Sequence, residues 1–197
     1  MRRRRSRDAA AVEIFLETQR MVLRRFTMDD VDALLALDSD PRVRQFVEDG
    51  EPVNREEAAG TIQHFLGYYE RSDVFGFWVA IDKQSGRFLG WFHFRPRPDQ
   101  PSDEPELGYR LVSSSWGLGY ATEGSRALID KGFESPSISR VVAESMAVHT
   151  ASRRVMEKAG MRLVRSFPTE WPVRIAGDEE GEVEYSISRS EWESDAT

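Results

Sequence analysis

The chain contains no cysteine among its 197 residues and only three histidines, His64, His93 and His149. The missing thiols exclude disulfide bridges, thiolate metal sites and a catalytic cysteine nucleophile. The histidines stand far apart in the sequence, so their spacing gives no metal-ligand pattern and we expect no metal. No apolar run approaches the roughly 18 residues that a membrane-spanning helix needs, so we expect no membrane partner.

Basic residues are unevenly spread, with five arginines among the first seven positions. Asp8, Glu13 and Glu17 interrupt the apolar residues that follow, unlike the core of a secretory signal, so we expect a cytoplasmic protein. Without those arginines the chain has 22 basic against 34 acidic residues, a net charge of −12. That balance disfavours nucleic acid as a partner and is compatible with a cationic acceptor such as an amine.

Length and hydrophobic patterning favour a single α/β (α+β) domain. With 40% hydrophobic residues the chain has enough apolar material for one packed core. We assign residues 1–16 to a flexible N-terminal extension, 17–192 to the domain and 193–197 to a C-terminal tail. Apolar periods predict the order β-α-α-β-β-β-α-β-α-β-β, a mixed sheet of about seven strands with helices on both faces.

Local start and stop signals define most of these elements. Thr27 with Asp30, and Asn54 with Glu57, have the spacing of a helix-capping box. The strands are expected at residues 19–26, 75–81, 88–94, 106–112, 140–146, 161–167 and 183–187, and two further helices at 122–133 and 150–159.

The most informative stretch runs from Ser114 to Glu123, where Gly117, Gly119 and Ala121 lie between an expected strand and an expected helix. Small residues let a ligand approach the backbone, and the start of a helix offers free N–H groups and the positive end of its dipole. This arrangement suits a pyrophosphate. No Lys-Ser/Thr pair follows the glycines, which excludes a P-loop, and the absence of G-x-G-x-x-G argues against a dinucleotide-binding fold.

Three further stretches accompany this loop, whose residues 116–123 read WGLGYATE. They are residues 17–26 (ETQRMVLRRF), 106–111 (ELGYRL) and 152–161 (SRRVMEKAGM). Together they resemble the GNAT superfamily of acyl-coenzyme A N-acyltransferases, in its Rim-type group of ribosomal-protein N-terminal acetyltransferases and their small-substrate relatives. The resemblance implies a twisted, mostly antiparallel sheet with splayed fourth and fifth strands, acetyl-coenzyme A (acetyl-CoA) as co-substrate, and an amine acceptor. A homodimer is common among the relatives, and no feature of the sequence demonstrates one.

The resemblance also assigns coenzyme contacts. The pyrophosphate loop falls on Trp116, Gly117, Leu118, Gly119, Tyr120 and Ala121, with a hydroxyl from Thr122, and the pantetheine arm lies along the backbone of Leu111 and Val112. The family's Asn-x-x-Ser turn reads His149-Thr150-Ala151-Ser152. Trp116 replaces the usual Gln or Arg, which leaves phosphate binding to backbone N–H groups. His149 replaces an asparagine that holds pantetheine amides, and it cannot reproduce the two-sided geometry of an amide.

The reaction implied is direct attack of an amine on the thioester, without a covalent acyl-enzyme. Glu106 is assigned as general base and Ser152 as the group that hydrogen-bonds the leaving sulfur. In alternative roles, Glu106 orients substrate or faces solvent, and Ser152 caps a helix or contacts the coenzyme. The tyrosine that many members carry on the helix after Ser152 is missing. Tyr109 and Tyr120 are expected to be core or coenzyme-packing residues, and His93 an ordinary strand residue, with a place facing the acceptor as its alternative.

The acceptor stays open between a peptide N-terminal or small-molecule amine, an antibiotic or polyamine, and no acceptor at all in a silent acyl-CoA-binding module. A peptide α-amine, with pKa near 7.7, is roughly one-fifth neutral at pH 7, against about 0.04% for a lysine amine. One weak base therefore favours α-amines. We expect the acceptor pocket between residues 42–51, 96–103 and 166–181. Its expected walls are Trp78, Trp91, Glu170 and Trp171.

Overall fold

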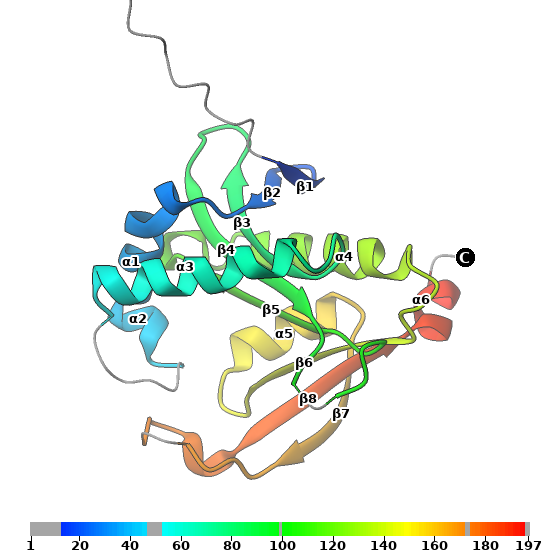
Figure 1. The fold of residues 1–197 in the computed structure, drawn as a ribbon. Helices are drawn as coiled ribbons and strands as arrows, with labels where there is room; N and C mark the ends of the chain where they lie inside the picture. Colours follow the sequence, from blue (N-terminus) through cyan, green and yellow to red (C-terminus); the bar gives the residue numbers. More distant parts are fainter. Residues whose placement is uncertain (1–12, 47–52, 99, 172–173, 196–197) are drawn as a thin grey trace, which may run out of the picture.

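The computed structural model describes residues 13–46, 53–98, 100–171 and 174–195, which form an eight-stranded sheet with helices on both faces. The strands follow the order β1-β2-β3-β4-β5-β6-β8-β7 across the sheet, from top to bottom of Figure 1. Every neighbouring pair is antiparallel except β5 and β6, which are parallel. The expected mixed, mostly antiparallel α/β fold is therefore confirmed, with one strand more than the seven expected.

The strands are β1 (Ile14–Glu17), β2 (Met21–Arg25), β3 (Gly76–Asp82), β4 (Phe88–Arg95), β5 (Glu106–Leu111), β6 (Arg140–Met146), β7 (Arg162–Phe167) and β8 (Glu182–Ser188). The α-helices are α1 (Val31–Asp38), α2 (Pro41–Arg44), α3 (Arg55–Tyr69), α4 (Tyr120–Phe133), α5 (Thr150–Lys158) and α6 (Arg189–Asp195). Three short 3-10 turns are η1 (Met28–Asp30), η2 (Ser113–Ser115) and η3 (Asp178–Glu180).

Both expected capping boxes are present. The Asn54 side chain accepts hydrogen bonds from the backbone N–H groups of Glu56 (2.9 Å) and Glu57 (3.1 Å), and the Glu57 carboxylate accepts from the Asn54 N–H at 3.0 Å. The Asp30 carboxylate accepts from the Thr27 N–H at 2.9 Å. These bonds satisfy N–H groups that have no partner within a helix, and so fix where η1 and α3 begin.

The sheet separates two hydrophobic clusters. Helices α1 and α3 cover one face, where the buried residues include Leu34, Ile62 and Trp91. Helices α4 and α5 cover the other face, where they include Phe92, Leu128 and Met156. Trp91 and Phe92 are adjacent on β4 and point to opposite faces, as side chains alternate along a strand.

Strands β5 and β6 part almost at once. Glu106 and Val142 are the one pair in register between them, and the Val142 N–H donates to the Pro105 carbonyl at 3.0 Å. The expected splay is therefore confirmed. On the other edge of β5 the Val112 N–H donates to the Leu89 carbonyl at 3.0 Å. Backbone N–H and C=O groups alternate in direction along an antiparallel strand, so those of residues 107, 109 and 111 point towards the gap.

Secondary structure extends past both expected domain boundaries. The boundary at residue 17 falls inside β1, which pairs with β2 and stacks Phe15 on Trp78 with ring centroids 4.0 Å apart. The boundary at residue 192 falls inside α6, where Trp192 stacks on Phe133 at 5.2 Å. The expectations for residues 1–12 and 196–197 lie outside the described residues.

Candidate active site

The gap between β5 and β6 opens into a cleft of about 730 Å³. It runs from the glycine loop, past the start of α5, to the face of β4 and β5 that carries Trp91, His93 and Glu106. Of the site residues expected from the sequence, the structure brings nine into the wall of this cleft. They are Glu106, Leu111, Trp116, Gly117, Gly119, Ala121, Thr122, His149 and Ser152.

Three expected coenzyme contacts, Val112, Leu118 and Tyr120, are not in that wall. The Val112 side chain packs on the α1–α3 cluster, and its backbone N–H donates to the Leu89 carbonyl, away from the gap. The Leu118 side chain is exposed, and its carbonyl accepts a hydrogen bond from the Arg20 guanidinium at 2.9 Å. The buried Tyr120 hydroxyl donates to Asp82 at 2.7 Å. The Leu118 carbonyl and the Tyr120 hydroxyl therefore help to hold the loop in place, and contacts of these three residues with the coenzyme stay predictions.

The glycine loop depends on two left-handed residues. Gly117 has φ +72° and Gly119, the N-cap of α4, has φ +86°, a region that glycine adopts without strain. A Cβ added at Gly117 would meet nothing within 4 Å, so the loop surface is open. Glu123 accepts from the Thr18 hydroxyl at 2.6 Å and from the Arg20 N–H at 2.8 Å, which ties the chain before β2 to α4. The free N–H groups of the first turn of α4 therefore face a fixed, open loop.

A second hollow of about 510 Å³ adjoins this loop and shares Gly119, Thr122 and Lys158 with the cleft. Arg126 also lines it, with its guanidinium donating to the Lys158 carbonyl at 2.8 Å. Cationic side chains beside a helix N-terminus match a ligand that carries several phosphates. The residues present therefore fit the phosphate groups of acetyl-CoA at the loop and its pantetheine arm along the gap.

Trp116 has a role that its sequence position did not suggest. Its indole Nε1 donates to the Leu111 carbonyl at 2.8 Å, on the side of β5 that faces the gap. This bond uses one of the backbone groups that an added strand would need. The backbone groups of Tyr109 and the Leu111 N–H remain turned towards the gap for a pantetheine arm.

His149 stacks on Phe46, with ring centroids 3.7 Å apart and planes inclined by 5°. Burial lowers the pKa of His149 to about 4, so the imidazole is neutral near pH 7. Phe46 follows α2, and its ring reaches across the cleft to the start of α5. Sequence reasoning missed Phe46, because no local pattern relates it to a residue 103 positions away.

Tyr109 does more than pack. Its hydroxyl donates to the Ser152 carbonyl at 3.1 Å and lies 3.0 Å from Ser152 Oγ. Burial raises the pKa of Tyr109 to about 12, so the phenol keeps its proton across the neutral range. Helix α5 lacks the tyrosine that many family members carry there. In this chain Tyr109, on β5, places a phenol beside Ser152.

Glu106 and His93 lie side by side in the cleft wall. Glu106 Oε2 is 3.6 Å from His93 Nε2 and 3.2 Å from the Arg95 guanidinium. Burial raises the pKa of Glu106 although Arg95 opposes the shift. Burial, with Arg95 and Arg110 nearby, lowers the pKa of His93 to about 3. A partly desolvated carboxylate beside a neutral imidazole is suited to accept a proton from a bound amine.

His93 is therefore not the ordinary strand histidine that we expected. It faces Gly108 across the β4–β5 ladder, and a Cβ at Gly108 would lie 2.4 Å from His93 Nε2. The glycine thus makes room for the imidazole beside Glu106. In the sequence, a glycine two residues after Glu106 is the only signal of this arrangement.

The expected acceptor pocket is correct for some walls and wrong for others. Trp91 and Trp171 line the cleft, together with Val43, Gln45 and Phe46 from the expected 42–51 segment. Trp78 is 1% exposed within the α4-side core, because its position on β3 points it to the other face. Glu170 and the described residues of the 96–103 loop lie outside the lining.

In the part of the chain that the structure describes, no helix is long and apolar enough to cross a membrane. The same residues contain no group of three or more His, Asp or Glu side chains placed to hold a metal ion.

Comparisons with known proteins agree with this geometry. The acetyltransferase (GNAT) domain family matches residues 20–162. The chain is 34% identical over 183 residues to the FsC-acetyl coenzyme A-N(2)-transacetylase of Aspergillus fumigatus, covering 90% of this chain and 77% of that protein.

Solved structures show the same fold. A GNAT-family acetyltransferase from Bacillus anthracis superposes with a TM-score of 0.75 at 24% identity, covering 89% of this chain and 98% of that one. RimL, a ribosomal-protein alpha-N acetyltransferase solved with coenzyme A, superposes with a TM-score of 0.76 at 18% identity, covering 89% and 98%. The chain therefore belongs to the GNAT acetyltransferase family, whose members transfer an acetyl group from acetyl-CoA to nitrogen.

Proposed function

We propose that the protein acetylates a primary α-amine, of a peptide N-terminus or of a small molecule, by direct attack on acetyl-CoA with Glu106 as general base. The observation that carries this proposal is the place of Glu106. Its carboxylate is partly desolvated, lies 3.6 Å from a neutral His93 and lines the same cleft as the glycine loop. A carboxylate with a raised pKa is a better match for the proton of an amine than an exposed one.

Bound acetyl-CoA supplies the thioester acetyl group. Glu106 takes the proton that the amine nitrogen loses as the nitrogen–carbon bond forms and the carbon–sulfur bond breaks. Ser152 Oγ hydrogen-bonds the leaving thiolate, and Tyr109, which lies 3.0 Å from that oxygen, holds it in position. Glu106 then gives its proton to solvent, and the released thiolate takes one from solvent. No cysteine is required at any point, in keeping with a chain that has none.

The charges in the cleft support an amine of low total charge. Glu106, Glu144 and Glu182 are the carboxylates in its described lining, and each has a partner. Arg95 lies beside Glu106, Arg97 pairs with Glu144, and the Thr169 hydroxyl donates to Glu182 at 2.8 Å. A polyamine or aminoglycoside would find no unpaired carboxylate among them. The Aspergillus relative, named for transfer to a nitrogen called N(2), also supports a specific amine acceptor.

Thiol release from acetyl-CoA tests the acceptor class. The panel is a set of peptides, amino-acid amides, lysine with a blocked α-amine, spermidine and an aminoglycoside. We expect the highest kcat/KM with free α-amines because they are the most neutral at pH 7. Faster release with the blocked lysine, or release with spermidine or the aminoglycoside alone, would contradict the proposal.

Replacing Glu106 tests the base. We expect Glu106→Gln, which keeps the shape and removes the proton acceptor, to lower kcat by about 100-fold or more without changing acetyl-CoA affinity. The wild-type rate should fall as the pH drops through the raised pKa of Glu106, because the protonated acid cannot accept a second proton. Glu104→Gln is the control, since Glu104 pairs with Arg140 outside the cleft lining. An active Glu106→Gln enzyme with an unchanged pH profile would exclude Glu106 as the base.

A further inference from the structure

Four carboxylates share one face of the sheet at the end of the cleft that holds Glu106. Leu107 on β5, Ala143 on β6 and Val183 on β8 belong to the α4–α5 cluster. Side chains alternate along a strand, so the acids next to these residues point to the opposite face. We call them the acidic row: Glu106, Glu144, Glu182 and Glu184. Like charges that face each other across strands destabilise a sheet, so this row needs cations between its members.

Strand register brings members of the acidic row close together. Glu106 pairs with Val142 between β5 and β6, and Glu144 is two residues further along β6, on the same face. Glu144 also lies directly opposite Glu184 between β6 and β8. The Glu184 side chain is only 5% exposed, so water screens little of this repulsion. An unpaired charge on Glu144 would therefore act on Glu184 and on Glu106.

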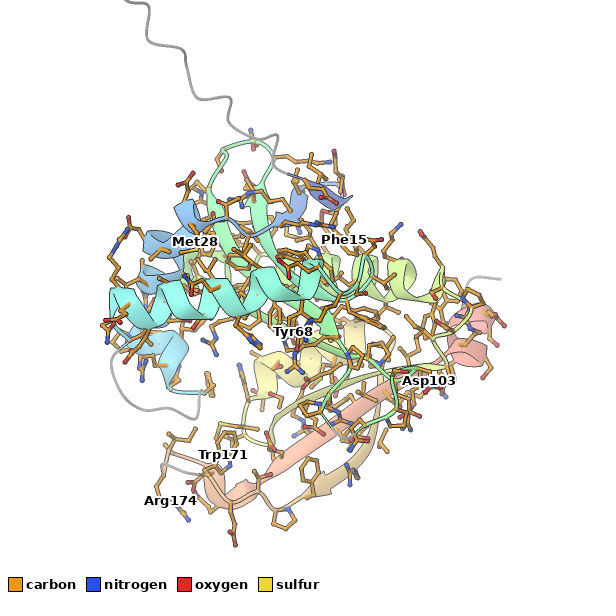
Figure 2. The ribbon with its side chains drawn as sticks, in the orientation of Figure 1. Phe15, Met28, Tyr68, Asp103, Trp171 and Arg174 are labelled. Atoms are coloured by element: carbon orange, nitrogen blue, oxygen red, sulfur yellow. The ribbon has the colours of Figure 1, made fainter. Side chains whose placement is uncertain are left out.

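Arg97 is the cation that lies between these acids. It comes from the loop after β4, pairs with Glu144, and has its guanidinium 3.5 Å from Glu184. Near the other end of that loop Asp103, labelled in Figure 2, accepts from the Ser139 N–H at 2.9 Å, just before β6. Arg97 is outside the lining of the cleft, so it acts on a bound substrate only through the acids that it pairs with.

Glu106 is surrounded by charged and titratable groups from both sides of the gap. Burial raises the pKa of Glu106, Arg95 and Arg97 oppose the rise, and Glu144 and Glu182 add to it. Arg97 interacts more strongly with Glu144 than with Glu106. The groups that face Glu106 are therefore His93 and Arg95 from β4, Arg97 from the following loop, Glu144 from β6 and Glu182 from β8.

We propose that Arg97 is a positioning residue of the reaction, which neutralises Glu144 and Glu184 and so keeps the Glu106 carboxylate ionised and able to accept the proton of the amine. The inference rests on the proposed acetylation with Glu106 as base. Without Arg97, the unpaired charge of Glu144 disfavours the ionised form of Glu106, which then holds a proton at higher pH and is blocked as a base. Removing the charge of Glu144 as well restores the balance.

NMR titration of the glutamate carboxyl groups tests this balance without turnover. The side-chain carboxyl carbons are isotope-labelled, and Glu106→Gln assigns the Glu106 signal. We expect Arg97→Gln to raise the titration midpoint of Glu106 by about one pH unit, as loss of one nearby opposite charge does at a partly desolvated site. Arg97→Gln/Glu144→Gln should return the midpoint to near its wild-type value, and Arg97→Lys should keep it there.

Arg165→Gln is the matched control. Arg165 pairs with the same Glu184 at 2.9 Å, but it is 57% exposed and is not among the groups that act on Glu106. It should leave the midpoint of Glu106 unchanged. Glu144→Gln alone should lower the midpoint, because Arg97 then acts on Glu106 unopposed, and this variant decides the matter if Arg97→Gln does not fold. A midpoint that none of these changes moves, or a rise that Glu144→Gln does not reverse, would overturn the role of Arg97.

Turnover gives a second readout. We expect the acid limb of the pH profile of kcat/KM to move with the NMR midpoint in every variant, whereas a purely structural role of Arg97 would lower Tm and leave the limb in place. A limb that stays fixed while the midpoint moves would contradict Glu106 as the base and leave the charge balance standing. If no amine releases thiol, the proposed acetylation fails, and the carboxyl titration still decides whether Arg97 keeps Glu106 ionised.

Discussion

Burial shifts individual groups of the cleft in a way that suits proton transfer. Desolvation disfavours the charged form of any group, so it raises the pKa of Glu106 and Tyr109 and lowers that of His93. Near neutral pH the cleft therefore holds an uncharged imidazole, a protonated phenol and a carboxylate that binds a proton more readily than an exposed one. Each shift comes from the position of the residue on β4 or β5, beside the gap.

Replacing Tyr109 tests its link to Ser152. We expect Tyr109→Phe to lower kcat about tenfold with little change in the KM for acetyl-CoA, because Ser152 Oγ loses the hydroxyl 3.0 Å away that positions it. Steady-state kinetics measure both constants. Tyr120→Phe is the matched control: it removes the 2.7 Å bond to Asp82, so it should lower Tm and leave kcat unchanged. An unaltered kcat in Tyr109→Phe would mean that the Tyr109 hydroxyl does not position Ser152 for the reaction and that the ring only packs.

Motifs predict the residues that a family's local sequence patterns contain, and fail for residues whose surroundings depend on distant partners. Glu106, Gly119 and Ser152 were found because the family's local sequence patterns contain them. The contact of Tyr109 with Ser152 and the place of His93 beside Glu106 were not predicted, since they depend on a partner 43 residues away and on register across β4 and β5. The coenzyme and catalytic roles of Glu106, Gly119 and Ser152 stay predictions until the variants are measured.

At the scale of elements, the glycine loop is held by groups that the sequence places far from it. Arg20 donates to the Leu118 carbonyl and to Glu123, and its guanidinium lies 4.4 Å from the centre of the Tyr120 ring. The chain just before β2 therefore fixes the loop between β5 and α4 from outside. A loop held in this way offers its N–H groups to a phosphate without an ordering cost on binding.

A substitution at Gly119 tests whether the loop binds the coenzyme. We expect Gly119→Trp to weaken acetyl-CoA binding at least about 100-fold, because a side chain at φ +86° strains the loop and fills its surface. Isothermal titration calorimetry measures the affinity. Gly86→Trp is the control, since Gly86 also has a positive φ, of +70°, in the β3–β4 turn, and a Cβ there meets nothing within 4 Å. Equal affinity in both variants would place the phosphates elsewhere.

Elements with their own start and stop signals were predicted closely, and elements stabilised by remote contacts were not. The capping box at Asn54 fixes α3, and the apolar run of 140–146 matches β6. The short strand β1 lacks such a signal. The polar helix α6 has one that was overlooked, a capping box in which Glu191 accepts from the Ser188 N–H at 2.9 Å and Ser188 Oγ accepts from the Glu191 N–H at 3.3 Å. Both elements are stabilised by stacking of Phe15 on Trp78 and of Trp192 on Phe133, contacts that local reasoning does not contain.

At the scale of the whole molecule, the sheet is two parts joined along β5 and β6 by one residue pair. The hydrophobic cluster on the α4–α5 side joins the two parts. Polar and aromatic contacts also cross the gap: the Tyr109 hydroxyl lies 3.0 Å from Ser152 Oγ, Arg97 pairs with Glu144, and Phe46 stacks on His149. A ligand lying along the gap adds backbone pairing to both parts, so binding of coenzyme should stabilise the entire fold by mass action.

The two buried histidines make the stability of the molecule depend on pH. Their pKa values are about 3 for His93 and about 4 for His149 in the folded state, against about 6.5 unfolded. At pH values between the folded and unfolded pKa of each histidine, the unfolded chain binds more protons than the folded protein does. The free energy of unfolding is therefore highest above about pH 6.5 and falls on acidification, by up to about 1.4 kcal/mol per pH unit for each histidine.

Urea unfolding between about pH 7.5 and pH 5 measures this dependence. We expect the double variant His93→Gln/His149→Asn to flatten the profile, because neither replacement takes up a proton on unfolding. His64→Asn, at the exposed histidine on α3, should keep the wild-type slope. Glu106 acts in the opposite sense, since its raised pKa lets the folded state keep a proton that the unfolded chain releases, so Glu106→Gln should steepen the loss at the acid end. A wild-type profile as flat as that of the double variant would mean that these histidines are not held neutral by the fold.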